Sequence, residues 1–400
     1  MMPSLLQKVA PRIFDPRISR VDPASQSIIS QRRPKTYGNC LLIHCVLKSG
    51  AATLTFFPMA SKRDLLTGRK GRLTVSIIGA GRLGLALGTA LRNAGVAIDV
   101  AISRSLLSAR RARRRLRAPA VAAGSRELRE LAPRYRALLQ QTDLILIAVP
   151  DDLVPRISDQ LTELLSSRKA VKGTSPRRPS AVMHTSGALT SRVLQPLQRL
   201  GIAVGSIHPL VSISGQGKNR PFSSVYFSLE GQAAAVRLGK QLVRHLGGRS
   251  FVLQTRKKPL YHAAALMVSP NLTALVDIAV EMMSRSGVPA ADAIRMLLPL
   301  IGSTLANLTH QDPAHALTGT FKRGDLETAR MHIDAIASQR LTDALGAYLI
   351  LGERSLKLSD ISRNKKAAIR DLLSQAAERS AATELPNQSS DCRIKSNSRS

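Results

Sequence analysis

The sequence predicts an α/β protein in which a parallel-sheet domain is followed by an all-α domain. Apolar, β-branched runs alternate with helix-length segments up to about residue 256. From Leu260 onward the pattern is wholly helical, and its first long run covers Tyr261–Ser286. A glycine-rich turn, Gly79 to Gly84, joins the first strand of this pattern directly to its first helix. These three observations together define the predicted architecture.

The glycine-rich turn lies in the run TVSIIGAGRLG, which has the spacing G-x-G-x-x-G between a strand and a helix. Gly79 permits a tight turn, Gly81 lets the backbone approach a pyrophosphate, and Gly84 lets the helix pack close to the strand. Backbone N–H groups at the start of the helix, including those of Arg82 and Leu83, can then bind phosphate oxygens. The motif therefore predicts a Rossmann-type domain that binds a dinucleotide.

The end of the second predicted strand indicates which dinucleotide binds. An NAD site usually places a carboxylate there for the ribose hydroxyls, but Asp99 lies in the middle of the strand, too early to reach them. Ser103, Arg104 and Ser105 follow at the strand end. A guanidinium and hydroxyls bind a 2′-phosphate that a carboxylate would repel, so the sequence favours NADP. The alternative is that Arg104 to Arg117 forms one solvated basic helix face.

The formal net charge is +33, and 59 Lys and Arg residues are scattered along the whole chain rather than gathered in one block. Aromatic residues, on which nucleic-acid bases stack, make up only 3% of the chain. We therefore favour a biased composition over a nucleic-acid site, and keep nucleic-acid binding as an alternative.

The cysteines Cys40, Cys45 and Cys392 all lie outside the predicted domains. This placement disfavours a disulfide framework, a catalytic thiolate or a zinc site, so no metal is expected. No apolar run approaches the roughly 18 residues that suggest a membrane span. We expect a cytoplasmic protein that acts on a small molecule and does not attach to a membrane.

The pattern divides the chain into four segments. Residues 71–256 form the predicted Rossmann NADP-binding domain, and residues 257–375 form a helical domain for substrate binding and dimerisation. Residues 376–400 are expected to be a disordered tail. Residues 1–70 are basic and lack periodicity, and three interpretations stay open: an organellar transit segment, a disordered extension, or an upstream extension with the true start near Met59.

Ligands bind beyond the carboxyl ends of the strands in an open parallel sheet. One polar cluster at such an end begins with Val149 and Pro150, which we expect beside the nicotinamide. Asp151 and Asp152 follow and either cap the next helix or act beside the hydride-transfer centre.

Two further strand ends carry histidines, His184 and His208, which can exchange a proton near neutral pH. Either one alone can instead satisfy backbone groups of a loop. Ser186 follows His184 closely and can position a substrate oxygen. In the helical domain, His262 and Asn271 are the residues expected to close the site.

Five segments in the same order resemble a known family, the Rossmann-like proteins that carry the domain of unknown function numbered 2520. The matching segments are SIIGAGRLGLALGTAL, ILIAVPDDLV, HTSGALTSRVLQPLQRLGIAVGSIHPL, KPLYHAAALMVSPN and ALTGTFKRGDLETARMHIDAI. The family is similar to NADP-dependent reductases that include pyrroline-carboxylate reductases, ketopantoate reductases and prephenate dehydrogenases. The resemblance implies a 6-phosphogluconate dehydrogenase-like helical domain, which often dimerises, so we expect a homodimer.

The resemblance to prephenate dehydrogenases implies roles for two residues. Those enzymes pair a serine after the fifth strand with a His-Pro after the sixth, and the matching positions are Ser186 and His208. There the histidine touches the substrate hydroxyl, which makes His208 the first candidate for the acid/base. The predicted function is an NADP-dependent oxidoreductase that transfers a hydride to or from a small carbonyl, imine or hydroxy compound. The alternative is a protein of another class, a sensor that binds NADP(H) without catalysis.

Overall fold

The computed structural model describes residues 73–123, 127–166, 178–213 and 222–384, and the backbone of four short strands between residues 40 and 58. The chain divides into two units, Met1–Thr74 and Val75–Ser400. In the first unit, four strands pair antiparallel as β1 with β4 and β2 with β3. Their bounds are β1 Cys40–Leu41, β2 Cys45–Lys48, β3 Ala51–Leu54 and β4 Phe57–Pro58. Met59 and the chain beyond residue 384 lie outside the described residues.

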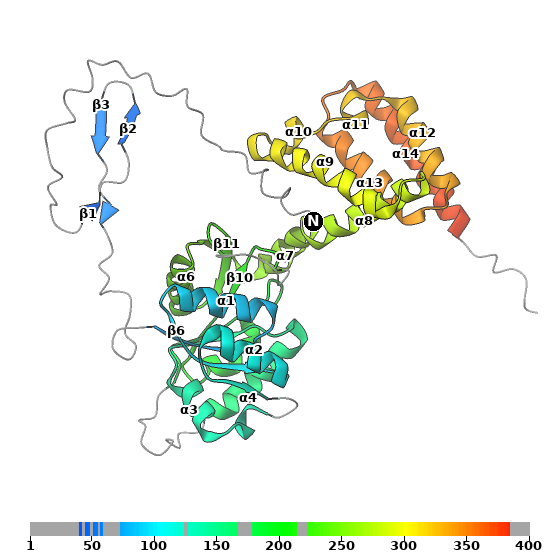
Figure 1. The fold of residues 1–400 in the computed structure, drawn as a ribbon. Helices are drawn as coiled ribbons and strands as arrows, with labels where there is room; N and C mark the ends of the chain where they lie inside the picture. The colour runs from blue at the N-terminus through cyan, green and yellow to red at the C-terminus, as the bar shows by residue number, and fades with distance from the viewer. Residues whose placement is uncertain are drawn as a thin grey trace, which may run out of the picture. The chain divides into compact units, whose positions relative to one another are not determined.

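The second unit contains an eight-stranded sheet, of which Figure 1 labels β6, β10 and β11. The strand order is β12-β11-β10-β9-β8-β5-β6-β7. The pairs β5–β8, β8–β9, β9–β10, β6–β7 and β11–β12 are parallel, whereas β10 and β11 are antiparallel. The strands are β5 Thr74–Ile78, β6 Ala97–Ser103, β7 Ala120–Ala122, β8 Leu144–Ile147, β9 Ala181–His184, β10 Ala203–Pro209, β11 Tyr226–Gly231 and β12 Arg249–Val252.

Strand β5 lies between β8 and β6, so the chain leaves it toward one side of the sheet and later returns to the other. Such a reversal opens a crevice at the carboxyl end of the central strand, where ligands bind in sheets of this kind. The glycine turn that follows β5 is therefore at the expected place. The residues of β8 and β9 are all buried, which is typical of parallel strands covered on both faces.

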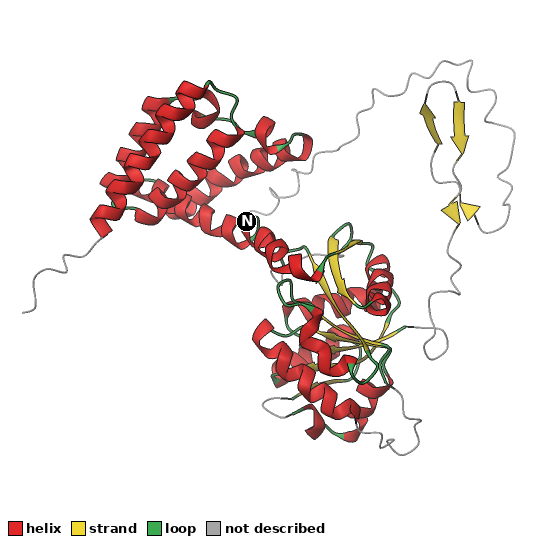
Figure 2. Cartoon of the chain, turned by 180° about the vertical axis from the view of Figure 1, so that it is seen from behind, coloured by secondary structure: helices red, strands yellow, loops and turns green. Residues whose placement is uncertain are grey.

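Helices cover both faces of the sheet (Figure 2). On one face, α4 and α5 pack with η3 and η5 over a core that includes Ile145, Val182 and Val204. On the other face, Gly88 of α1 lies against Ile77 of the sheet, and Gly239 of α6 lies against Leu229. The helices are α1 Arg82–Asn93, α2 Leu106–Leu116, α3 Pro133–Gln141, α4 Val154–Ser166, α5 Gln195–Gln198 and α6 Ala233–His245, and the short 3₁₀ helices are η3 Leu128–Glu130, η4 Asp151–Leu153 and η5 Ser191–Leu194.

Between residues 255 and 384 the chain contains helices and the turns that join them. A core of aliphatic side chains joins α12, α13 and α14, and includes Ile333, Leu345, Leu356 and Leu372. The elements are η6 Thr255–Lys257, α7 Lys258–Met267, α8 Pro270–Arg285, α9 Ala290–His310, α10 Pro313–Ala316, α11 Thr320–Arg323, α12 Leu326–Ser338, α13 Thr342–Leu358 and α14 Arg363–Glu384.

The fold class is as predicted, a largely parallel sheet domain followed by an all-α region. Three details differ. The expected single helix through Tyr261–Ser286 is two helices, because the chain leaves helical geometry at Val268 and Ser269 before Pro270. Strand β7 was not predicted, because three residues are too few to show a period. Helix α14 continues to Glu384, past the expected domain boundary at residue 375.

The stretch Thr255–Arg285 is long and apolar enough to cross a membrane, by length and composition only. No such stretch was expected from the sequence. Thr255–Arg285 spans the separate helices α7 and α8 rather than one continuous helix. Lys258, close to one end, is buried against the sheet domain. One such stretch among the described residues is weak evidence for a membrane span.

Candidate functional site

The glycine turn shows which of its positions the fold itself requires. Gly79 has a φ of 100°, and a Cβ there would collide with the carbonyl oxygen of Ala148. A Cβ at Gly84 would collide with the carbonyl oxygen of Gly79. A Cβ at Gly81 would meet nothing within 4 Å, so this position has open space beside it. The fold therefore accounts for Gly79 and Gly84, while Gly81 leaves room for a ligand.

Helix α1 begins directly after Gly81, which has no side chain to cap the free N–H groups of the first turn. The first turn contains no acidic residue, and the side chain of Arg82 is exposed. Partial positive charge at the helix start and uncapped donors form a site for an anion. The residues present thus fit the pyrophosphate of a dinucleotide.

The residues expected to hold the 2′-phosphate occupy different environments. Ser105 is the N-cap of α2: its Oγ accepts the backbone N–H of Ser108 at 3.2 Å. The hydroxyl of Ser103 is buried and has no hydrogen-bond partner within the part of the chain that the structure describes. Arg104 is exposed, and among the described residues its guanidinium forms no ion pair. Arg104 is therefore the group free to meet a phosphate.

The end of β8 lies beside the glycine turn. The Cγ1 atom of Val149 would be 2.8 Å from a Cβ placed at Gly79, so the two segments touch. The next residue, Pro150, is exposed and precedes η4. The side chain of Asp151 does not cap η4; its Oδ2 accepts the hydroxyl of Ser186 at 2.7 Å. The hydrogen bond connects two of the polar clusters that the sequence placed at strand ends.

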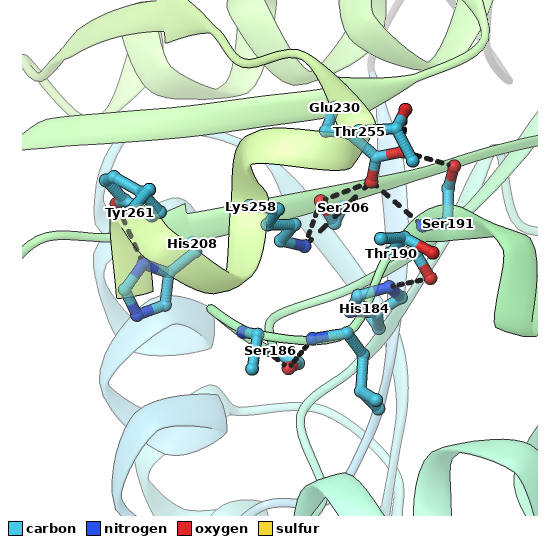
Figure 3. A network of polar contacts seen from close by, with 12 residues as sticks. His184, Ser186, Thr190, Ser191, Ser206, His208, Glu230, Thr255, Lys258 and Tyr261 are labelled. Atoms are coloured by element: carbon cyan, nitrogen blue, oxygen red, sulfur yellow. Dashed lines mark hydrogen bonds and ion pairs between the residues drawn. The ribbon is translucent and has the colours of Figure 1, made fainter. Parts of the chain in front are cut away.

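Ser186 is held in place by its neighbours. Its Oγ accepts the backbone N–H groups of Ala188 at 3.1 Å and Leu189 at 2.9 Å while it donates to Asp151. Figure 3 shows the two backbone N–H contacts of Ser186 below His208 and His184. The hydroxyl is thus oriented before any substrate binds.

The two strand-end histidines have different surroundings. His184 is fully buried, and its Nε2 lies 3.2 Å from the carbonyl oxygen of Thr190. Burial, and then the charge of Lys258, lower the pKa of His184 to about 3. This histidine therefore stays neutral and bonds a loop carbonyl, in agreement with the alternative interpretation that the sequence left open.

His208 is half-buried and lies among ring side chains from α7. Its Nδ1 is 3.0 Å from the hydroxyl of Tyr261, and its ring meets the ring of His262 edge-on with centroids 5.3 Å apart. Burial, the neighbouring His262 and the charge of Lys258 lower the pKa of His208 to about 4. His208 is thus neutral at pH 7 and able to accept a proton.

Gly187 makes the close approach of the two histidines possible. A Cβ there would collide with Nδ1 of His262 and would lie 2.9 Å from Nε2 of His208. The structure therefore brings together Ser186, His208 and His262. It gives no contact between Asn271 and these residues: Asn271 is exposed on α8, and its amide contacts the sulfur of Met267 at 3.3 Å.

Three residues of this region were not among the predicted site residues: Glu230, Lys258 and Tyr261. Lys258 Nζ donates to the hydroxyl of Ser206 at 2.6 Å and lies 3.9 Å from a carboxylate oxygen of Glu230 (Figure 3). Burial lowers the pKa of Lys258 to about 8, although the charges of Glu230 and Asp151 oppose the shift. The signals for these residues were an acid inside an apolar strand and the polar spacing of KPLYH.

A mostly parallel sheet with helices on both faces and an open glycine turn at its switch point is a Rossmann-type domain. Family models agree: residues 59–209 match the Rossmann-like domain. Residues 225–355 match the domain of unknown function DUF2520. The chain thus belongs to the proteins that combine a Rossmann-like domain with a DUF2520 domain. No curated protein matches the chain in the comparison.

Solved structures share this fold. The proposed NADP oxidoreductase BF3122 from Bacteroides fragilis is 20% identical, with a TM-score of 0.55 over 72% of this chain and 98% of that one. The protein TM1727 from Thermotoga maritima is 19% identical, with a TM-score of 0.52 over the same shares of the two chains. At these identities the likeness shows a common fold.

Proposed function

We propose that this protein is an NADP-dependent oxidoreductase that transfers a hydride to or from a small carbonyl, imine or hydroxy compound. The observation that carries the proposal is the pairing of two features at the carboxyl ends of the strands. One is the glycine turn with open space at Gly81, and the other is the cluster of Ser186, His208 and His262. The name of the Bacteroides fragilis protein, which has the same fold, supports the same class of activity.

The chain offers donors for each charged part of the dinucleotide. Backbone N–H groups of Arg82, Leu83 and Gly84 would bind the pyrophosphate where Gly81 leaves space, and Arg104 would bind the 2′-phosphate. Val149 and Pro150 would lie beside the nicotinamide, which supplies or accepts the hydride when NADP is bound. In this proposal the hydroxyls of Ser103 and Ser105 contribute less than Arg104, since one is buried and the other caps α2.

His208 would move the proton that accompanies the hydride. When Tyr261 donates its O–H to Nδ1, the ring carries its own proton on Nε2, the nitrogen on the side of Gly187 and His262. During reduction that Nε2–H would pass to the heteroatom of a carbonyl or imine while the O–H proton of Tyr261 passes to Nδ1, so the ring stays neutral and Tyr261 recovers its proton from solvent. In the reverse direction Nε2 would accept the proton of a hydroxyl or amine while Nδ1 returns its proton to the Tyr261 phenolate. Ser186 would hold the substrate heteroatom close by, and His262 would cover the site.

Two glycine variants test the cofactor site. Because a Cβ at Gly81 meets open space, Gly81→Ala should fold normally and lower NADPH affinity by about tenfold or more through contact with the pyrophosphate. Gly84→Ala, in which the Cβ meets the backbone of Gly79, should lower the melting temperature instead. Fluorescence titration with NADPH measures the first effect and a thermal melt the second. Unchanged NADPH affinity in Gly81→Ala would remove the proposed cofactor site.

Cofactor preference has its own test. Arg104→Ala should weaken NADPH binding about tenfold, because one charge-assisted contact to the 2′-phosphate is lost, while NADH binding stays the same. Arg114→Ala, at an exposed arginine within α2, is the matched control. Equal losses for both cofactors would argue against the role of Arg104.

Turnover distinguishes an enzyme from a sensor. NADPH oxidation with a panel of small aldehydes, ketones and cyclic imines should show a substrate for the wild-type protein. Tight NADPH binding without turnover across the panel would favour a non-catalytic NADP(H)-binding protein instead.

We also propose that two copies of the chain pair through α8 and α9. Helix α8 buries none of its residues, and α9 buries only Ala293. Large apolar side chains are instead exposed on these helices and on the end of α7: Leu266, Met267, Val268, Leu275, Met296, Leu298, Leu300, Leu305 and Leu308. Many exposed apolar side chains on neighbouring helices are typical of an interface, and closed two-fold pairs are the commonest way to cover one.

A further inference from the structure

The register of the sheet places buried polar residues in rows. His184 on β9, Ser206 on β10 and Glu230 on β11 lie opposite one another, and residues opposite one another in neighbouring strands share a face. His208 lies two residues further along β10, opposite Ser228, so it projects from the same face. His184, Ser206, Glu230 and Ser228 are all buried. Buried polar rows are costly unless partners satisfy them, so the covering element must supply those partners.

Helix α7 supplies partners for Ser206 and His208 from one of its faces. Lys258, Tyr261 and His262 have the spacing i, i+3 and i+4, which aligns their side chains on one face of a helix. Lys258 reaches the first row, where it bonds Ser206. Tyr261 and His262 reach the next row, where they meet His208. One helix face is thus matched, residue by residue, to two rows of the sheet.

The carboxylate of Glu230 gathers donors from several elements. It accepts the backbone N–H of Ser191 at 2.8 Å and the Ser191 hydroxyl at 2.7 Å. It also accepts the hydroxyls of Thr255 at 3.0 Å and Ser206 at 3.2 Å. Burial alone would raise the pKa of Glu230, but these hydrogen bonds and the charge of Lys258 lower it, so the group is ionised.

Lys258 and Glu230 do not reach a substrate, since both side chains are 1% exposed. A buried ion pair contributes little net stability over apolar residues of the same size, because both charges must leave water. A buried pair that is held by hydrogen bonds can instead select one geometry. Here it ties the start of α7 to β10 and β11, and displacement of Lys258 would leave the charge of Glu230 buried without its counter-ion.

We propose that the Lys258–Glu230 pair is a positioning element, which fixes the placement of α7 on the sheet so that Tyr261 and His262 reach His208. The choice of His208 as the proton-transfer group rests on the proposed function. The positioning itself rests on the contacts of Lys258 and Glu230. Lys258 is thus a positioning residue and not a catalytic one.

The pair has an electrostatic consequence for His208. The titratable and charged groups around His208 are Lys258, Tyr261 and His262 on α7, Glu230 on β11, His184 on β9 and Asp151 after β8. Lys258 is a source of positive charge for both His184 and His208. A fixed ammonium therefore disfavours protonation of His208 and keeps it neutral over a wide pH range.

Histidine-selective NMR on the full chain tests the proposal without a substrate. In Lys258→Met, the ring-to-ring NOE between His208 and His262 should disappear, and the titration midpoint of His208 should rise by about one pH unit. Lys257→Met is the matched control, because Lys257 is adjacent and exposed, and it should keep the wild-type NOE and midpoint.

A second variant covers the case in which Lys258→Met fails to fold because Glu230 is left unpaired. The double variant Lys258→Met/Glu230→Gln carries neither charge and should fold, lose the NOE and show the raised midpoint of His208. A folded variant lacking Lys258 that keeps both the NOE and the wild-type midpoint would overturn the proposal. Because neither readout needs turnover, that result would leave the proposed function intact, and failure of the NADPH tests would leave this proposal intact.

Discussion

The strand-end site and the α8–α9 surface treat their side chains in opposite ways. At the site, the charged groups Lys258 and Glu230 are 1% exposed and have hydrogen-bond partners. On α9, Leu300 is 63% exposed, although it is apolar. Charged side chains usually lie in water and large apolar side chains are usually buried, so both regions reverse the common pattern. The buried charges of the site are thus paired within one chain, whereas α8 and α9 leave many apolar side chains exposed.

The largest expected effect concerns the strand-end site. His208→Ala should lower kcat by about 10²–10⁴-fold, since a positioned proton-transfer group contributes about that much. NADPH affinity should change little, because the glycine turn is left intact. Steady-state kinetics on a substrate from the carbonyl and imine panel measure kcat, and fluorescence titration measures affinity.

His310→Ala, at an exposed histidine on α9, provides the control for that experiment. Wild-type kcat in His208→Ala would show that the strand-end region is a structural junction and has no catalytic role.

The next largest effect concerns the α8–α9 surface. Leu300→Glu should weaken self-association about 100-fold or more, because pairing would bury a carboxylate against apolar side chains. Analytical ultracentrifugation over a range of protein concentrations measures the dissociation constant. Leu106→Glu is the matched control, since Leu106 is similarly exposed, at 68%, but lies on α2. A monomeric wild-type protein would refute the proposed pairing and with it the contrast between the regions.

The smallest effect is a dependence of stability on pH. The pKa of His208 is about 4 in the fold and about 6.5 when the chain is unfolded, so the unfolded state binds more protons between these values. Its contribution to stability is therefore complete above pH 6.5 and is lost as pH falls toward 4. Between pH 7 and pH 5 the free energy of unfolding should fall by roughly 2 kcal/mol from this group.

Urea denaturation at the two pH values measures that change, and His184 adds to it in the same direction because its pKa is also lowered. The variant His208→Gln should show a correspondingly smaller fall. An equal fall in wild type and His208→Gln would mean that the ring is not buried as the structure places it.

The nature of each signal explains which parts of the site the sequence could predict. The turn at Gly79–Gly84 is a local pattern, because its glycine spacing lies between one strand and the helix that follows it. His208 and Ser186 followed from the rule that strand ends meet at one edge of a sheet. Lys258 and Glu230 lie on α7 and β11, and nothing in the spacing of a chain shows that two such residues form a buried pair.

Asn271 is the opposite case, a residue that was predicted for the site but does not contact it. It lies on a run that is helical by pattern, and it is expected, like His262, to close the site from the helical domain. The break at Val268 and Ser269 starts a new helix, and Asn271 is exposed on it without contact to His208. A break of two residues is a small change in pattern, but it redirects every side chain after it.

The sequence by itself determined the order of strands and helices, the glycine turn and the residues at the strand ends. Periodicity, glycine chemistry and the geometry of parallel strands act over short stretches of chain, so they can be recognised without coordinates. The tertiary structure alone decided that Lys258 pairs with Glu230, that Tyr261 meets His208, and that α8 and α9 leave many large apolar side chains exposed. Those outcomes depend on which surfaces of distant segments meet, and burial is a property of the assembled fold.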